Sequence, residues 1–336
     1  MHGSARAPFR TGMMPRLVLT LSLALISVRA VADCAPPPAV RAVPAAGSGE
    51  LSLATLNLWR LRDSDKDARY DEPLAPGRVE ARLQALAGMI HERLGAPHLL
   101  AVQEVENRTL LRRLARAVAE HGPDYRTLLR EGHDPSGLDV GLLYRAPVRI
   151  KDHEALFAER KQQGQWLFSR PPLRVRVQEP LVFDLVVVHL RSAHGLDEPD
   201  ERARVRAKRK EQARVLRHWV GKPVRRDPPV VLAGDFNSAP GDALYAEPWQ
   251  RMHRGLGSVW DHLPAHERFS HIHDCQRQAI DHIFYSDALK HRATDAAISR
   301  GNAGHYRTLY GAHGTDSAVS DHDAPVLYFD VEAGGQ

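Results

Sequence analysis

The chain has 336 residues, of which 43% are hydrophobic and 26% are charged. This composition is that of a globular protein and excludes low-complexity disorder, collagen and coiled coil as the main content. The net charge is +5, but residues 1–32 carry four Arg and no Asp or Glu, which leaves 42 of the 46 basic residues against 41 acidic ones. Global charge therefore gives no argument for nucleic-acid binding.

The N-terminus has the pattern of an export signal. Three arginines precede an apolar run over 17–28, and Ala30 and Ala32 offer a small-x-small cleavage site. Twelve apolar residues are too few to span a bilayer. We therefore predict that 1–32 is a secretory signal peptide and that the protein is exported to the periplasm or the medium. A buried N-terminal helix is the alternative.

The chain contains two cysteines, Cys34 and Cys275, and both follow the predicted cleavage site. In an oxidising compartment a disulfide between them would fix the mature N-terminus to the body of the domain. Two free thiols are the alternative. The sequence contains neither Cys-x-x-Cys nor a zinc-like spacing of Cys and His.

The rest of the chain is predicted to form one domain. Residues 33–49 are rich in Pro, Ala and Gly and predict an extended leader, and no linker interrupts residues 50–333. The predicted strands are 51–59, 99–105, 140–144, 173–177, 181–190, 230–233, 280–285 and 325–331, and the predicted helices are 79–94, 109–121 and 201–220. This order favours an α/β domain with helices outside its sheets.

Polar side chains stand at the ends of the first two apolar strands. Asn57 ends the first, and Glu104 ends the second. A carboxylate at such a position is costly to bury without a partner, and a hard cation such as Mg²⁺ would compensate its charge. A surface carboxylate at a strand end is the alternative.

The later strands end or begin in the same way. His189 ends a strongly apolar strand, although a lone histidine there is more often a core residue. Asp235 and Asn237 follow another strand, and the period of two predicts that they share a face. Asp281 opens the next strand, and Asp321-His322 precedes the last one. Together these residues suit metal-assisted phosphoester hydrolysis, with histidines for proton transfer and carboxylates that fix their tautomers.

Six segments also carry a resemblance to a known family. They are residues 54–57 (ATLN), 102–107 (VQEVEN), 187–192 (VVHLRS), 234–238 (GDFNS), 280–283 (IDHI) and 320–326 (SDHDAPV). The chain thereby resembles the endonuclease/exonuclease/phosphatase superfamily of deoxyribonuclease I-like fold, and QEVEN and HLRS are closest to its bacterial secreted nuclease-like members. The resemblance implies an α/β (α+β) fold, a four-layer α/β/β/α sandwich of two mixed β-sheets flanked by helices, with the site at one edge.

The resemblance also implies roles for individual residues. Glu104 matches the principal metal-binding carboxylate, with Asn57 beside it and Asp321 as a further metal or structural carboxylate. Asp235 and Asn237 match the pair that positions nucleophile, metal and phosphate. His322 matches the histidine that contacts the scissile phosphate, and Asp281 matches the carboxylate paired with it.

The nuclease branch implies four further positions. His189 matches the first catalytic histidine, and Asp139 is the candidate for its carboxylate partner. Arg170 resembles an arginine that contacts the substrate phosphate, with a surface arginine as the alternative, and Arg191 is a second candidate for a phosphate contact.

Two other patterns are open to both structural and functional interpretations. The predicted helix 201–220 carries a basic run that favours a solvated face over a phosphate-contacting flank; it comprises Arg202, Arg204, Arg206, Lys208, Arg209, Lys210, Arg214 and Arg217. His271 and His273 alternate in a predicted strand, without an evident third zinc ligand.

We therefore expect an exported, monomeric phosphodiesterase that uses Mg²⁺ or Mn²⁺, with Ca²⁺ as a further candidate, and that acts on DNA as an endonuclease. A phospholipid or sphingomyelin phosphodiesterase, or a phosphatase of small phosphoesters, would share the fold and the core motif. A non-catalytic binding protein is the third hypothesis, but it predicts missing acid–base residues. Loops 193–212 and 286–319 carry no assignment and leave the substrate open.

Overall fold

The structure is a computed structural model that describes residues 1–3, 35–221, 227–240, 247–305 and 318–332. The chain divides into two units, Met1–Cys34 and Ala35–Gln336. The first lies almost wholly outside the described residues, as do the predicted signal peptide and Cys34. Among the described helices, no segment has both the length and the apolar character needed to cross a membrane.

Two six-stranded sheets form the centre of the second unit, as far as the structure describes it. The first contains, in spatial order, β15 (Ala293–Ile298), β16 (Pro325–Asp330), β1 (Glu50–Leu61), β2 (Leu99–Val105), β4 (Asp139–Tyr144) and β3 (Arg126–Leu129). The second contains β11 (Leu256–Ser258), β14 (Asp281–Ser286), β10 (Val230–Asp235), β9 (Phe183–His189), β8 (Leu173–Glu179) and β5 (Arg149–Ala155). Two short hairpins stand apart: β6 (Lys161–Gln162) with β7 (Gln165–Trp166), and β12 (His271–His273) with β13 (Gln276–Gln278).

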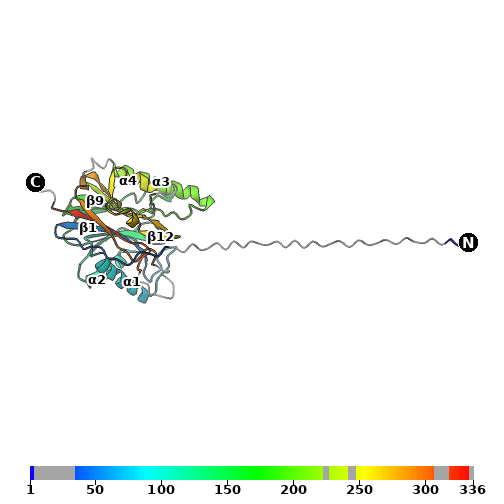
Figure 1. The fold of residues 1–336 in the computed structure, drawn as a ribbon, viewed down its shortest axis with the longest axis horizontal. Coiled ribbons are helices and arrows are strands. Elements are labelled where there is room, and N and C mark those ends of the chain that lie inside the picture. Colours follow the sequence, from blue (N-terminus) through cyan, green and yellow to red (C-terminus); the bar gives the residue numbers. More distant parts are fainter. Residues whose placement is uncertain (4–34, 222–226, 241–246, 306–317, 333–336) are drawn as a thin grey trace. The chain divides into compact units, whose positions relative to one another are not determined.

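Helices cover the outer face of each sheet (Figure 1). On one side lie α1 (Pro76–Gly88), extended by a π-helical turn (Met89–Arg93), and α2 (Arg108–Ala119); on the other lie α3 (Pro199–Val220) and α4 (Glu247–His253). Short 3₁₀ turns cover Val259–His262, Ala265–Glu267 and Asp287–Leu289. Proline at the start of α1 and of α3 fits a position where no backbone donor is needed.

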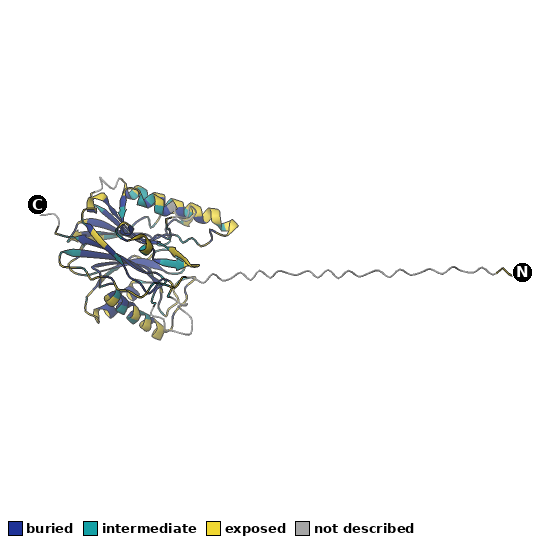
Figure 2. Cartoon of the chain, viewed as in Figure 1, coloured by how far each residue is buried: buried dark blue, intermediate teal, exposed yellow. Residues whose placement is uncertain are grey.

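Three hydrophobic layers hold these four structural layers together. One lies between the first sheet and α1 and α2, one between the two sheets, and one between the second sheet and α3 and α4. Figure 2 shows the corresponding pattern, with buried strands and helices exposed on their outward faces. Because the central strands β2, β9 and β10 are covered on both faces, they are largely apolar along their length rather than alternating. The predicted four-layer sandwich is confirmed.

The predicted elements match the observed ones closely, and the largest omissions are strands at the edges of the sheets. β3, β5, β11 and β15 were not predicted, and neither was the short helix α4. Edge strand β5 is half-exposed and polar along its length, so no apolar run marks it. The described part of the predicted leader is bonded to the body of the unit: Arg41 forms a β-bridge with Arg300, and the backbone N–H of Val43 donates to Arg93 O at 2.9 Å.

Candidate active site

Each sheet contains a pair of parallel strands, and the candidate site lies where these two pairs end. β1 runs parallel to β2, and β9 runs parallel to β10. The carboxyl ends of parallel neighbours lie on the same side of a sheet. Asn57 and Glu104 therefore lie toward the carboxyl ends of the first sheet's pair, and His189 and Asp235 at those of the second sheet's pair. The two sets meet in the site, where Asn57 Nδ2 donates to Asp235 Oδ2 at 3.3 Å.

Glu104 leaves the regular strand geometry. Its φ is +61°, and the register of β2 with both neighbouring strands shifts at this point. The irregularity matches a β-bulge, which re-aims a side chain. Glu104 Oε2 accepts a hydrogen bond from the backbone N–H of Arg60 at 2.9 Å, and Oε1 lies 3.9 Å from His189 Nε2. The predicted metal carboxylate therefore does lie beside the other site residues.

The relation between Asp235 and Asn237 differs from the prediction. β10 ends at Asp235, and Asn237 lies beyond it with φ +49°, so strand alternation does not place the pair. Instead, Asp235 Oδ1 accepts from the backbone N–H of Asn237 at 2.7 Å, and Asn237 Nδ2 donates to Leu190 O at 3.1 Å. The two side chains share the site because of a tight turn, which asparagine tolerates better than most residues.

Gly234 is required by the approach of a neighbouring strand. Its φ is +149°, and a Cβ atom there would lie 2.0 Å from Val188 O. The approaching group is the backbone of β9. This close contact brings the end of β10 against the end of β9, directly beside His189.

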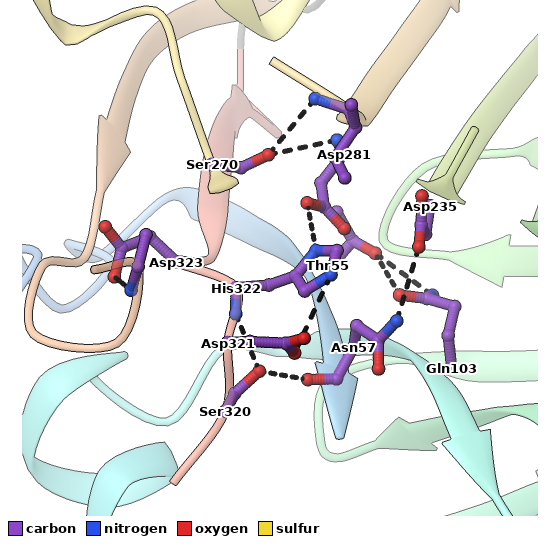
Figure 3. Close-up of polar contacts among 12 residues, drawn as sticks. Thr55, Asn57, Gln103, Asp235, Ser270, Asp281, Ser320, Asp321, His322 and Asp323 are labelled. Carbon is purple, nitrogen blue, oxygen red and sulfur yellow. Dashed lines mark hydrogen bonds and ion pairs between the residues drawn. The ribbon is translucent and has the colours of Figure 1, made fainter. Parts of the chain in front are cut away.

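His322 and Asp281 form the central ion pair of the site (Figure 3). His322 Nδ1 lies 2.7 Å from Asp281 Oδ2, and both side chains are buried. On the other side of the ring, Nε2 lies 3.7 Å from Asp321 Oδ1. The predicted partnership of His322 with Asp281 is present, and Asp321 lies beside it.

Polar residues that the sequence did not single out hold this pair in place. Ser270 Oγ accepts from the backbone N–H of Asp281 at 3.1 Å, and Ser320 Oγ donates to Asn57 O at 2.7 Å (Figure 3). Ser320 Oγ also accepts from the backbone N–H of His322 at 3.0 Å. Ser320 lies next to the Asp-His motif, which was its only signal, and nothing in the local sequence marked Ser270.

The carboxylates around His322 favour its charged form. Burial alone would lower the pKa of His322, but Asp281, Asp321 and Asp235 together raise it well above the usual range. Burial, followed by the charge of Asp281, raises the pKa of Asp235 to about 7. Burial likewise raises the pKa of Asp321 to about 6, with a contribution from Glu104. The site therefore gathers more negative charge than His322 can balance.

His189 has the opposite environment. Arg170 Nη1 lies 2.9 Å from Nδ1, and Asp235 Oδ2 lies 3.4 Å from Nε2. Burial, then the charges of Arg170 and His322, lower the pKa of His189 well below the usual range. The second histidine is therefore a neutral imidazole beside a guanidinium.

The predicted partnership of His189 with Asp139 is not formed. Asp139 Oδ1 accepts from the backbone N–H of Gly132 at 2.9 Å, and burial raises the pKa of Asp139 to about 8. Asp134 is linked to His189 only through Arg170: Asp134 Oδ2 lies 2.8 Å from Arg170 Nε. Asp139 opens β4, where its register partner is Val105, whereas Asp134 comes from the preceding loop, where no motif marked it.

Helix α3 carries both buried and exposed cations, and a buried one bonds to the backbone beside the site. Arg209 is buried and donates to Arg191 O at 2.7 Å and to Asn237 O at 2.8 Å. Burial, then Arg204 and Arg170, lower the pKa of Arg191, and burial, then Arg191 and Arg204, lower that of Lys208. The predicted solvated face is therefore correct for exposed Arg206, Lys210 and Arg214, but Arg209 is a structural exception.

Two other histidines lie close by. His282 follows Asp281 on β14 but belongs to the core, where its ring lies 2.8 Å from Ser238 O and accepts from Trp260 Nε1 at 3.0 Å. His271 lies against His322, with ring centroids 4.9 Å apart. His271, Asp321 and His322 can bring ligand atoms within 4.8 Å of one another, so β12 does lie near further ligating groups.

Cys275 has no free thiol. Cys34 lies outside the described residues, so the predicted pairing of the two cysteines stays a prediction.

The donor set fits a hard divalent cation. Asp235, Asp281 and His322 can also bring ligand atoms within 4.8 Å of one another. Oδ1 of Asp321 and Oδ1 of Asp281 are buried without a hydrogen-bond partner. Unpaired buried carboxylate oxygens are costly, and a cation bound through oxygen would compensate them.

Comparisons with known proteins agree with this arrangement. The model of the Endonuclease/Exonuclease/phosphatase family matches residues 54–322. No curated protein matches. Similar solved structures include TDP2 from C. elegans (16% identity, 84% of this chain and 76% of that chain, TM-score 0.56), an endonuclease/exonuclease/phosphatase from Bacteroides vulgatus (15%, 84% and 99%, 0.56) and an AP endonuclease from Archaeoglobus fulgidus (16%, 83% and 99%, 0.55). At these identities the likeness shows the fold.

Proposed function

Because the chain belongs to the Endonuclease/Exonuclease/phosphatase family and has its phosphoesterase fold, we propose that it is an exported, divalent-metal-dependent phosphodiesterase that cuts DNA internally. The observation that carries this proposal is the 2.7 Å contact of His322 with Asp281, inside a ring of carboxylates from both sheets. A charged imidazole beside acidic groups of raised pKa suits the binding of a phosphodiester and the activation of water.

The residues take the following roles in this proposal. His322, held in its charged form by Asp281, donates through Nε2 to an oxygen of the scissile phosphate. Asp235, with a pKa of about 7, accepts a proton from the attacking water. Asn237, fixed by the turn after β10, helps to orient the phosphate.

His189 and Arg170 interact with the leaving group in this proposal. His189 is neutral, so its role is to donate a hydrogen bond to the leaving oxygen rather than to supply a second charge. Arg170, which Asp134 holds at 2.8 Å, supplies the positive charge there. Glu104, Asn57 and Asp321 would hold the Mg²⁺ or Mn²⁺ ion. When bound, this ion would neutralise phosphoryl oxygens.

A cationic edge supports a polyanionic substrate. Arg170 and Arg204 lie close enough to Arg191 and Lys208 to contribute, after burial, to the lowered pKa of each. Such a group of cations favours a nucleic acid, whose repeated phosphates would bind in a salt-dependent manner.

The test incubates the chain from residue 33 onward, the expected product of signal cleavage, with supercoiled circular DNA and Mg²⁺. We expect nicking that EDTA abolishes and that His322→Ala lacks, while the exposed Glu159→Gln control keeps it. Because a closed circle has no end, nicking would establish endonuclease action. Failure to cut would refute the proposed substrate, and linear DNA, sphingomyelin vesicles and small phosphoesters would then be assayed. Secretion of a product that begins at Asp33 would test export.

A further inference from the structure

A second acidic cluster lies outside the candidate active site. It consists of Asp67 and Asp71, from the loop that follows β1, and Glu106, just beyond the end of β2. Ligand atoms of the three carboxylates lie within 4.8 Å of one another. Asp71 and Glu106 are each only 3% exposed, so two of the three carboxylates are buried.

Two carboxylate oxygens in this cluster have no hydrogen-bond partner. They are Oδ2 of Asp71 and Oε1 of Glu106, and both are buried. The second oxygen of each group is already used: Asp71 Oδ1 accepts from Arg62, and Glu106 Oε2 accepts from the backbone N–H of Asp63 at 2.5 Å. Each of these two residues therefore has one buried oxygen without a hydrogen-bond partner, which is costly unless a ligand binds to it.

The charges of the cluster are not balanced. Arg62 is the cation that the structure pairs with it in the described chain, and its contact is with Asp71. Three carboxylates whose oxygens lie this close repel one another, which calls for a cation or a proton between them.

We propose that Asp67, Asp71 and Glu106 bind a Ca²⁺ ion that stabilises the loop after β1. Ca²⁺ accepts six to eight oxygen ligands in irregular geometry, so it tolerates carboxylates from a loop and a strand end and can complete its shell with water. Mg²⁺ demands a stricter octahedron. The site shares no residue with the candidate active site.

Such an ion would act next to the catalytic carboxylate. Glu106 lies two residues after Glu104, and Arg60, which donates its backbone N–H to Glu104 Oε2, lies just before the loop. The ion would tie the loop to the end of β2 and so keep this donor in place. The site is therefore structural, with an indirect effect on the position of Glu104.

The experiment compares thermal unfolding in CaCl₂ and in EDTA. The parent is the chain with Glu104→Gln and Asp321→Asn, which weakens binding of the cation at the active site. We expect CaCl₂ to raise the Tm of this parent, because a ligand that binds only the folded state stabilises it. Adding Glu106→Gln should abolish the rise, and adding the exposed Glu159→Gln should leave it unchanged.

The same variants show whether the fold is intact. In EDTA, Glu106→Gln should melt at or above the temperature of the parent, since the neutral amide removes repulsion and still accepts from Asp63. If that variant does not fold, exposed Asp67→Asn replaces it, with at least about tenfold weaker CaCl₂ binding expected by calorimetry. An equal rise with and without Glu106, or no rise in the parent, would overturn the proposal.

Discussion

The two histidines of the site face opposite electrostatic surroundings, although both stand at the end or the beginning of an apolar strand. His322 is surrounded by Asp281, Asp321 and Asp235, which keep it charged. His189 contacts Arg170 and is buried, which keeps it neutral. A residue type and its place on a strand therefore do not fix its chemistry. Most of the neighbours that decide the charge are distant in sequence: Asp281 and Asp235 come from other strands, and Arg170 comes from the loop before β8.

The largest effect on kcat should follow from substitutions in the charged His322–Asp281 pair. His322→Ala and Asp281→Asn remove the imidazolium or the carboxylate that sustains it, and kcat should fall about 10³–10⁴-fold in each. Steady-state cleavage of DNA measures the loss, and circular dichroism checks that the fold is retained. A double variant should be little worse than either single one, because the pair acts as a unit. Near-normal turnover in either single variant would refute the assignment.

A smaller effect on kcat is expected from substitution of the neutral His189. His189→Gln keeps a hydrogen-bonding group without a charge, and kcat should fall about 10²-fold, at the lower end for acid–base residues. The same assay measures it. A loss as large as that of His322→Ala would show that the two histidines contribute equally and would remove the contrast.

Arg170→Ala tests the cause of that neutrality. Removal of the adjacent positive charge should raise the pKa of His189, while burial still keeps it below 6.5. NMR titration of the imidazole resonances follows the change, with Arg206→Ala on the exposed face of α3 as the control. An unchanged His189 pKa would mean that burial alone keeps the ring neutral.

The smallest effect concerns the support of the loop that carries His322. Arg41 and Arg300 both bond to Glu267, and the hydrogen bond from Arg41 is the main cause that lowers the pKa of Glu267 to about 2. A depressed pKa contributes stability above the unfolded value of about 4.5, and this contribution disappears as the pH falls toward 2. Glu267→Gln should therefore lose about 1–2 kcal/mol at pH 7, discounted for exposure of Arg41, and progressively less below pH 4.5. Urea unfolding at several pH values measures the difference, and a constant difference would contradict the explanation.

Much of the fold was predictable because the central strands of both sheets are buried on both faces. The central strands β1, β2, β9 and β10 are continuous apolar runs that end in polar residues, so the runs predicted the elements and the residues after them predicted the site. Edge strands such as β5 lack this signal, since their exposed positions accept any polar residue.

The predictions failed where a contact depends on a turn rather than on a strand. Asn237 reaches the site through a left-handed turn, and Asp134 rather than Asp139 bears on the His189 side through Arg170. Loops bring such residues together across dozens of positions, and their local sequence carries no period that could reveal it. Ser270, which positions Asp281, escaped prediction for the same reason. Arg209 was named only as part of the basic run, yet from α3 it donates to Asn237 O.

The hydrogen bond from Ser320 to Asn57 joins residues 263 positions apart, and strand β16, which follows Ser320, pairs with β1. The first and last strands of the unit are thus neighbours, and the catalytic ring closes only between them. A chain emerging from the ribosome holds Asn57 early and His322 almost last. Synthesis order alone therefore keeps the candidate site incomplete in the unfinished polypeptide until β16 has been synthesised and has docked.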